Sequence, residues 1–362
     1  MDIYSTYYML AAVEELPIEH TFFRSRYFPT DNAMDVFGTS RVLADFREGT
    51  QKKAPFVIPR LGALPVGRDG FSTYELEPAN ISISMPLTID QLNKRNFGES
   101  IMSTATPADR ARRLLVGDLA TLSAMISRSE ELLAVQTILD NGAVMRHQTE
   151  NPDIYEDIGV HFYDGNSNPA LFTPAGSWTH SSKSGETWTM GTWYADMCAM
   201  VARLTKKGRP VREFVVSPNV ADFLLADGWV QSVLDNRRME MGGIEPSALD
   251  EFTYVMGVLN FKGRVLPIIV NDGTYENEAG QDTPFLPNGT VICTAPGCGR
   301  GLYGAHTRMT ENGEWETIAG KRIPDHIFTR RPPANEVELT ARPLFVPNRA
   351  NPWCVAKNIT LA

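Results

Sequence analysis

One uninterrupted helical pattern constrains this chain more than any other feature of its sequence. Thr106 suits the N-cap position, Pro107 the first helical position and Asp109 the positive end of the helix dipole. Asn141, followed by glycine, is typical of a helix C-cap. At the rise of an α-helix, residues 107–140 span about 50 Å. The pattern therefore predicts a spine helix that is longer than a small domain is wide.

The apolar side chains of this helix fall on one stripe. They recur at spacings of three, four and seven residues: Leu115, Leu119, Leu122, Ile126 and Leu133. Charged residues lie off the stripe: Arg112, Asp118, Arg128 and Glu130. A coiled coil is the alternative, but Gly117 and Ser129 interrupt the heptads. The pattern therefore favours a spine that packs along one side.

Extended chain with turns is predicted for the segment before the spine, residues 54–86, because its prolines and glycines exclude helix. Arg68-Asp69-Gly70 predicts a hairpin turn between residues 56–66 and 71–76. Residues 81–85 alternate apolar side chains with serines, as in a strand with one buried face. Such a hairpin makes a poor core of its own, which indicates an arm completed by another chain; folding onto its own domain is the alternative.

The N-terminal residues predict a short helix and an aromatic arm. Residues 5–16 form the helical pattern, with Pro17 as its stop. The arm that follows carries four aromatic side chains interleaved with two arginines: Phe22, Phe23, Arg24, Arg26, Tyr27 and Phe28. So much apolar surface must be covered, either by the chain's own core or by a neighbouring subunit, and the sequence favours neither.

After the spine, residues 142–190 lack a helical period and predict short strands and loops. An α/β region follows, with predicted helices at 193–204 and 219–226 and a buried strand at 213–216. A hairpin turn is predicted at Lys262-Gly263, and another strand at residues 290–294.

One glycine motif, Gly299 to Gly304, has the spacing of a dinucleotide-binding loop and follows a predicted strand. The loop requires a helix that opens on the glycines, whereas this chain continues into a turn sequence at 310–314. It also lacks the Gly-Lys-Ser/Thr of a Walker loop. We interpret the motif as a tight turn, and a nucleotide-dependent enzyme remains a remote alternative.

No catalytic or metal-binding constellation is apparent elsewhere. The four cysteines are scattered, and a metal site built from Cys293, Cys298 and His306 lacks a fourth ligand. Histidine pairs of metal-site spacing and a Gly-x-Ser-x-Gly elbow are both missing. The sequence therefore predicts reduced, partly buried thiols, no cofactor, no metal and no enzymatic activity.

Charge and hydropathy limit the partners. Lysine and arginine total 34 against 43 aspartates and glutamates, a net charge of −9, so tight nucleic-acid binding is not expected. The chain has no long apolar run and no secretory signal pattern at its start, so we expect no membrane contact and work in a cytoplasm.

Taken in order, the arm, extended hairpin, spine helix, strand-rich stretch, α/β region and C-terminal strand resemble the Hong Kong 97 type phage capsid fold. More closely, the chain resembles the lambda-type major head proteins of the phage major capsid protein E family. The matching stretches span nearly the whole chain: residues 4–12, Phe22-Phe23-Arg24, Pro107 to Arg113, Phe285 to Thr290, Gly301 to Gly304 and Arg342 to Pro347.

The resemblance implies an α+β fold with five regions. They are an N-terminal arm at 1–45, an extended E-loop at 46–90 that reaches a neighbour, a peripheral domain with the spine at 91–190, an axial domain at 191–305, and a return to the peripheral domain at 306–362.

It also implies a structural subunit of an icosahedral phage head that forms hexamers and pentamers around double-stranded DNA. The implied partners are a separate scaffolding protein and a portal, while binding of a decoration protein outside is left open. The implied location is the virion, after assembly in the host cytoplasm. A tail or decoration protein is the alternative. The residues expected at subunit contacts are Phe22, Phe23, Arg60, Arg68, Phe71 and Tyr74.

Overall fold

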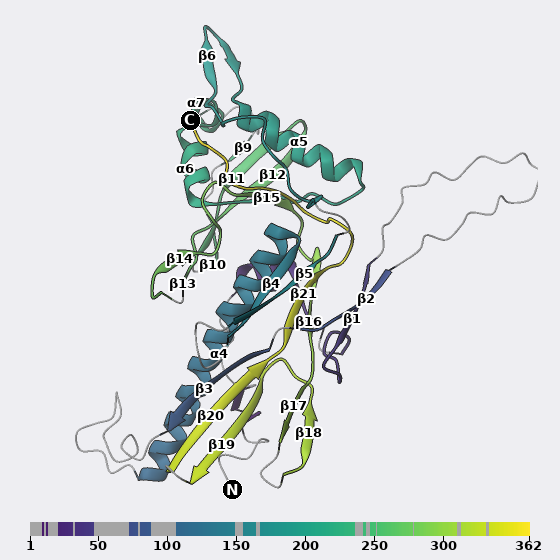
Figure 1. Cartoon of the computed structure of the whole chain (residues 1–362). Helices are drawn as coiled ribbons and strands as arrows, with labels where there is room; N and C mark the ends of the chain where they lie inside the picture. The colour runs from purple at the N-terminus through teal and green to yellow at the C-terminus, as the bar shows by residue number, and fades with distance from the viewer. Residues whose placement is uncertain are drawn as a thin grey trace, which may run out of the picture.

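Two regions of structure, one above the other in Figure 1, are joined by a long helix. The computed structural model describes residues 9–10, 12–13, 21–31, 33–46, 72–78, 80–87, 106–148, 155–163, 167–235, 242–243, 247–250, 252–277, 279–309, 313–330 and 333–362. None of the helices in these ranges has the length and apolar character of a membrane span. Of the predicted first helix, the described residues 9–10 and 12–13 are helical.

The spine is helix α4 (Pro107–Asp140), as the sequence predicts. Thr106 and Asp109 cap its start by exchanging hydrogen bonds, the Thr106 hydroxyl accepting from the Asp109 backbone N–H and the Asp109 carboxylate from the Thr106 N–H. Asn141 ends it in the left-handed conformation, at φ 50°. Because both caps are local, the helix bounds are readable from the sequence alone.

The lower half of the spine lies on a three-stranded antiparallel sheet, β19–β20–β3 (Figure 1). Its strands are β3 (Ile81–Leu87), β19 (Ile323–Arg330) and β20 (Pro333–Ala341). Leu115 and Leu119 pack on Val337, and Leu122 packs on Leu339. In β3 the serines are exposed while Ile81, Ile83 and Met85 pack toward the spine, which confirms the predicted alternation.

The upper region is built on a mixed sheet with strand order β10-β11-β12-β8-β15-β22, to which β9 adds beside β11. Its strands are β8 (Glu213–Val216), β9 (Gly242–Gly243), β10 (Ser247–Asp250), β11 (Thr253–Phe261), β12 (Arg264–Asn271), β15 (Val291–Thr294) and β22 (Cys354–Ala356). Three helices lie on one face: α5 (Thr192–Lys206), α6 (Pro218–Ala226) and α7 (Gly228–Asp235). The predicted helices and strands of this region are confirmed, as is the turn at Lys262 and Gly263, both with positive φ.

Strand β8 contributes side chains to both faces of this sheet, one covered by helices and one packed on the spine. Phe214 and Val216 point to the helical face, whereas Val215 points to the opposite face. That opposite face packs on the upper half of the spine, through Leu133 to Leu139. The spine therefore contributes to two cores, one with the lower sheet and one with the upper sheet.

Six two-stranded ribbons complete the described fold. They are β1 (Val42–Phe46) with β2 (Ser72–Leu76), β4 (Gly142–Gln148) with β5 (Tyr155–His161), β6 (Ser182–Ser184) with β7 (Thr187–Thr189), β13 (Thr274–Glu276) with β14 (Asp282–Pro284), β16 (Gly299–Tyr303) with β21 (Pro343–Pro347), and β17 (His306–Met309) with β18 (Trp315–Ile318). Strand β2 pairs with β1, and the predicted partner segment 56–66 and the predicted turn at Asp69 both lie outside the described residues.

The glycine motif is not the tight turn that the sequence suggests. Gly299 and Gly301 lie in strand β16, which pairs with β21. A Cβ on Gly299 would overlap the ring of Phe28, and one on Gly301 would lie 2.6 Å from Thr30 Oγ1. The glycines therefore allow the N-terminal segment to cross strand β16 in close contact. The need for glycine at these positions comes from Phe28 and Thr30, which lie far away in the chain.

Two glycine-to-alanine substitutions should act in opposite directions. Gly117→Ala adds a methyl group in open space on the spine, so it should raise the free energy of unfolding by about 1 kcal/mol. Gly299→Ala forces the Phe28 ring to move, so it should lower that free energy by about 1–3 kcal/mol. Urea denaturation of the unassembled subunit measures both. A neutral Gly299→Ala would contradict the close crossing.

Candidate functional site

The aromatic arm joins the spine to the upper sheet. Residues 21–28, which we call the clamp, contain the short helix α2 (Phe22–Tyr27). Phe23 and Tyr27 are completely buried, and Phe22 is 7% exposed. With Phe28 they share one core with Leu133 to Leu139 of the spine and with Val215 of the upper sheet. The structure therefore covers this apolar surface with the chain's own core, one of the two alternatives left open by the sequence.

The spine caps the clamp helix through Glu131. Its carboxylate accepts hydrogen bonds from the backbone N–H groups of Phe23 (2.6 Å) and Arg24 (2.9 Å). These are donors that the first turn of a helix leaves unsatisfied, and the Thr21 side chain at the N-cap does not take them. Burial raises the pKa of Glu131 to about 7, against the opposing effect of these hydrogen bonds.

Glu130, the neighbouring residue, ties the clamp to the lower region. Its side chain is fully buried, forms an ion pair with Arg24 Nη1 (2.9 Å) and, through both oxygens, accepts hydrogen bonds from Arg322 (2.6 and 2.8 Å). The sequence pattern placed Glu130 off the buried stripe, which is wrong as a guide to exposure. The clamp and the segment before β19 cover the second side of the spine and supply the cations that a buried carboxylate requires.

Glu213, the first residue of β8, holds the other end of the clamp. Arg26 donates to both of its oxygens, Nε at 2.8 Å and Nη2 at 2.5 Å. The Tyr27 hydroxyl donates to Oε1 at 2.6 Å. Burial and the Glu213 charge together raise the pKa of Tyr27 well above its usual value. Three buried glutamates, two on the spine and one on the sheet, thus fasten a single short helix.

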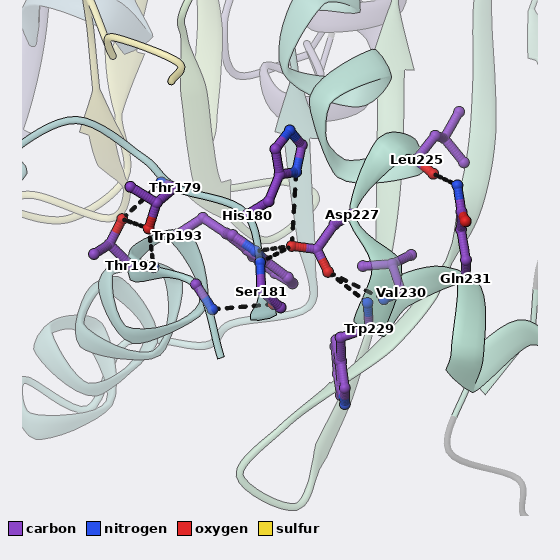
Figure 2. A network of polar contacts seen from close by, with 11 residues as sticks. Thr179, His180, Ser181, Thr192, Trp193, Leu225, Asp227, Trp229, Val230 and Gln231 are labelled. Atoms are coloured by element: carbon purple, nitrogen blue, oxygen red, sulfur yellow. Dashed lines mark hydrogen bonds and ion pairs between the residues drawn. The ribbon is translucent and has the colours of Figure 1, made fainter. Parts of the chain in front are cut away.

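A second polar network fixes the upper end of the molecule (Figure 2). Asp227 is fully buried, and its Oδ1 accepts from the backbone N–H groups of Trp229 (2.9 Å) and Val230 (3.3 Å), which caps helix α7. Its Oδ2 accepts from the Ser181 N–H (2.6 Å) and from Trp193 Nε1 (2.9 Å). These hydrogen bonds outweigh the effect of burial and lower the pKa of Asp227. The network therefore holds the segment before the β6–β7 hairpin in place through Ser181.

Over the described ranges, no three potential metal ligands lie close enough to hold an ion. All four cysteines are free, as predicted, and buried. Burial raises the pKa of Cys298 to about 12, which makes it a poor nucleophile.

The predicted contact residues fall into three groups. Phe22 and Phe23 lie in the chain's own core, as described above. Tyr74 lies in β2, where its backbone pairs with Ala44 of β1. Arg60, Arg68 and Phe71 lie outside the described residues.

Sequence reasoning missed the charged residues of the clamp. Two signals could have found them: arginines interleaved with four aromatic residues in a segment too apolar for solvent, and a glutamate that opens the buried strand at 213–216. A charge inside an apolar segment indicates a buried partner of opposite charge.

Comparison with known proteins identifies the family. The model for phage major capsid protein E matches residues 5–358. The chain belongs to the phage major capsid protein E family. It is 24% identical to the major capsid protein of Escherichia phage lambda over 344 residues, which cover 93% of each chain.

A solved structure supports the fold of this family member. The chain resembles a protein described as a prophage capsid protein (E. coli CFT073) with a TM-score of 0.61 and 15% sequence identity, covering 99% of each chain. The fold is therefore the α+β, Hong Kong 97 type capsid fold predicted from the sequence. As a phage major capsid protein, the chain is a structural subunit of a phage head, and its place is in the virion.

The buried Glu131 makes stability depend on pH. Its folded-state pKa of about 7 lies above the ordinary value of 4.5, so the folded state holds a proton that the unfolded state releases. Between pH 4.5 and 7 the free energy of unfolding should therefore fall as pH rises. Glu131→Gln keeps an acceptor without the charge, so its stability relative to the natural protein should increase over that range by on the order of 1–3 kcal/mol.

Urea denaturation of the unassembled subunit at pH 5, 6 and 7 measures this difference. Glu156→Gln, at an exposed position on β5, is the matched control and should not change the pH profile. If Glu131→Gln and the natural protein kept the same difference in stability at every pH, Glu131 would not be the buried acid described.

Proposed function

We propose that this capsid protein assembles into hexamers and pentamers of a closed icosahedral shell around double-stranded DNA, and that it catalyses no reaction. The clamp carries the proposal. It connects the spine, the segment before β19 and the upper sheet through three buried glutamates, which holds the two described regions together. A shell built from copies of one chain requires a subunit that keeps its shape while it presents several edges to neighbours.

The division into arm, E-loop, peripheral domain and axial domain remains part of the proposal. Figure 1 supports it in outline, because the β1–β2 ribbon leaves the side of the body and the mixed sheet sits at the end opposite the lower sheet. We infer that residues 46–90 contain the E-loop that reaches a neighbouring subunit and end in β3 of the lower sheet. We also infer that residues 191–305 form the axial domain together with β22, and that residues 91–190 and the rest of 306–362 form the peripheral domain.

The proposed partners follow from the same function. Copies of the chain bind one another, a separate scaffolding protein guides their assembly in the host cytoplasm, and a portal occupies a vertex. The net charge of −9 supports weak contact with the enclosed DNA, because close phosphate contacts would require clustered cations.

Expression of the chain together with its scaffolding protein should yield closed particles in negative-stain electron micrographs, with hexameric and pentameric clusters. Because DNA contacts are weak, nuclease treatment before assembly should leave the particle yield unchanged. A subunit that stays monomeric at high concentration with scaffold present would contradict the proposal, and a requirement for DNA would contradict its weak-contact part.

A further inference from the structure

Three cations lie together at the end of helix α5. Arg203 and Lys206 belong to its last turn, and Lys207 is its C-cap. Lys206 and Lys207 are exposed, and Arg203 is half-buried. None of the three forms an ion pair within the part of the chain that the structure describes. The helix dipole attracts cations to this end, but it is worth about half an elementary charge and does not balance three. The end of α5 is therefore a positive surface.

Arg203 fixes the position of this surface. Its guanidinium donates to the backbone carbonyls of Leu171 (2.8 Å) and Pro169 (3.0 Å), which accept hydrogen bonds without neutralising the charge. Arg203 and Lys207 also line a small pocket, together with Asn351. The surface therefore attracts an anion, and its charge alone does not distinguish a carboxylate from a phosphate.

The β13–β14 ribbon presents the opposite charge. Glu276 and Asp282 lie directly opposite each other across the two strands, so both carboxylates are on one face of the ribbon. Both side chains are exposed, and among the described residues neither has a cation as a partner. Like charges at directly opposite positions destabilise a pair of strands. A positive surface supplied by another molecule would remove this repulsion.

The other face of the ribbon is anchored, so the acidic face is held outward. Tyr275 alternates with Glu276 along the strand and packs on Phe285, with ring centroids 5.2 Å apart. Phe285 in turn packs against the core that the clamp shares with the upper sheet. At the turn, Asn277 Oδ1 accepts from the backbone N–H group of Gln281 (3.0 Å). The ribbon therefore presents its two carboxylates in a fixed position.

The positive and the acidic surface lie on opposite sides of the upper region. Helix α5 begins near α7, where the rings of Trp193 and Trp229 are 6.0 Å apart, and runs toward the right in Figure 1. The β13–β14 ribbon projects on the left. Within one subunit the two surfaces are apart, whereas neighbouring copies can bring them together.

We propose that the acidic face of the β13–β14 ribbon in one subunit binds the end of α5 in a second copy of this chain. The inference rests on the proposed assembly function and adds the residues of one contact to it. A second copy accounts for both unpaired surfaces at once, whereas nucleic acid would account for the cations alone. The contact also occupies cations that would otherwise face the enclosed DNA.

The position of the two surfaces sets the symmetry of the contact. Because they lie on different sides of the subunit, the contact is head-to-tail, and repeated contacts of that kind close into a ring when the rotation between copies allows it. Hexamers and pentamers are rings of this kind. Opposite charge sets the partner and its orientation.

Charge reversal with rescue tests the contact. Lys206→Glu with Lys207→Glu, and Glu276→Lys with Asp282→Lys, should each lower the yield of assembled particles about ten-fold, because like charges then meet. Sedimentation and electron microscopy measure the yield. All four substitutions together should restore most of it, because the charges are exchanged. The thermal unfolding of each unassembled variant should match that of the natural protein, since all four side chains are exposed.

Arg264→Glu is the matched control, because it reverses an exposed arginine elsewhere in the upper sheet. Adding Glu276→Lys and Asp282→Lys should not rescue any defect it causes. Equal rescue of this control would overturn the proposal.

Natural yield from Lys206→Glu with Lys207→Glu would also overturn the proposal, and weaker binding of DNA by those particles would assign the end of α5 to nucleic acid. Folded subunits with all four substitutions that fail to regain yield would overturn it as well. Failure of the natural chain to assemble would instead contradict the proposed function.

Discussion

The structure depends on the burial of three glutamates around one short helix. Glu130 and Glu131 on the spine and Glu213 on the upper sheet all meet the clamp, and the clamp supplies Arg24, Arg26 and two backbone N–H groups in return. Removing one partner from such a pair leaves a buried charge without compensation, at a cost of about 3–5 kcal/mol. The apolar rings of the clamp make the same connection without charge. An N-terminal segment therefore decides whether the two regions of the molecule act as one body.

This arrangement suits the role of a capsid subunit. The spine contributes Leu115 and Leu119 to the lower core and Leu133 to Leu139 to the core under the upper sheet, so both regions pack on the same helix. The Asp227 network adds a second fixed point at the upper end. The buried carboxylates of the clamp and of the Asp227 network accept hydrogen bonds from several donors each, which is how buried polar groups stabilise one arrangement of the chain.

Local signals made much of the fold predictable, and long-range contacts account for the rest. The spine begins and ends at its predicted caps, and β8 and the Lys262-Gly263 turn also follow from neighbouring residues. The burial of Glu130 and the glycines beneath Phe28 depend on contacts between segments far apart in the chain, which a periodic pattern does not reveal. For that reason the sequence predicts a turn at Gly299, where the structure has strand β16, whereas the resemblance to a capsid family is confirmed.

The claim that the clamp couples the two regions can be measured most directly by hydrogen exchange on the unassembled Arg26→Ala variant. Arg26 bonds to Glu213 on the sheet, so a loss of amide protection in β8 alone would be a local effect. Coupling predicts that residues 133–139 of the spine lose protection to the same extent. Arg41→Ala, which removes an exposed ion pair with Glu75, should leave both regions unchanged. Full protection of the spine in Arg26→Ala, with β8 exposed, would contradict the account.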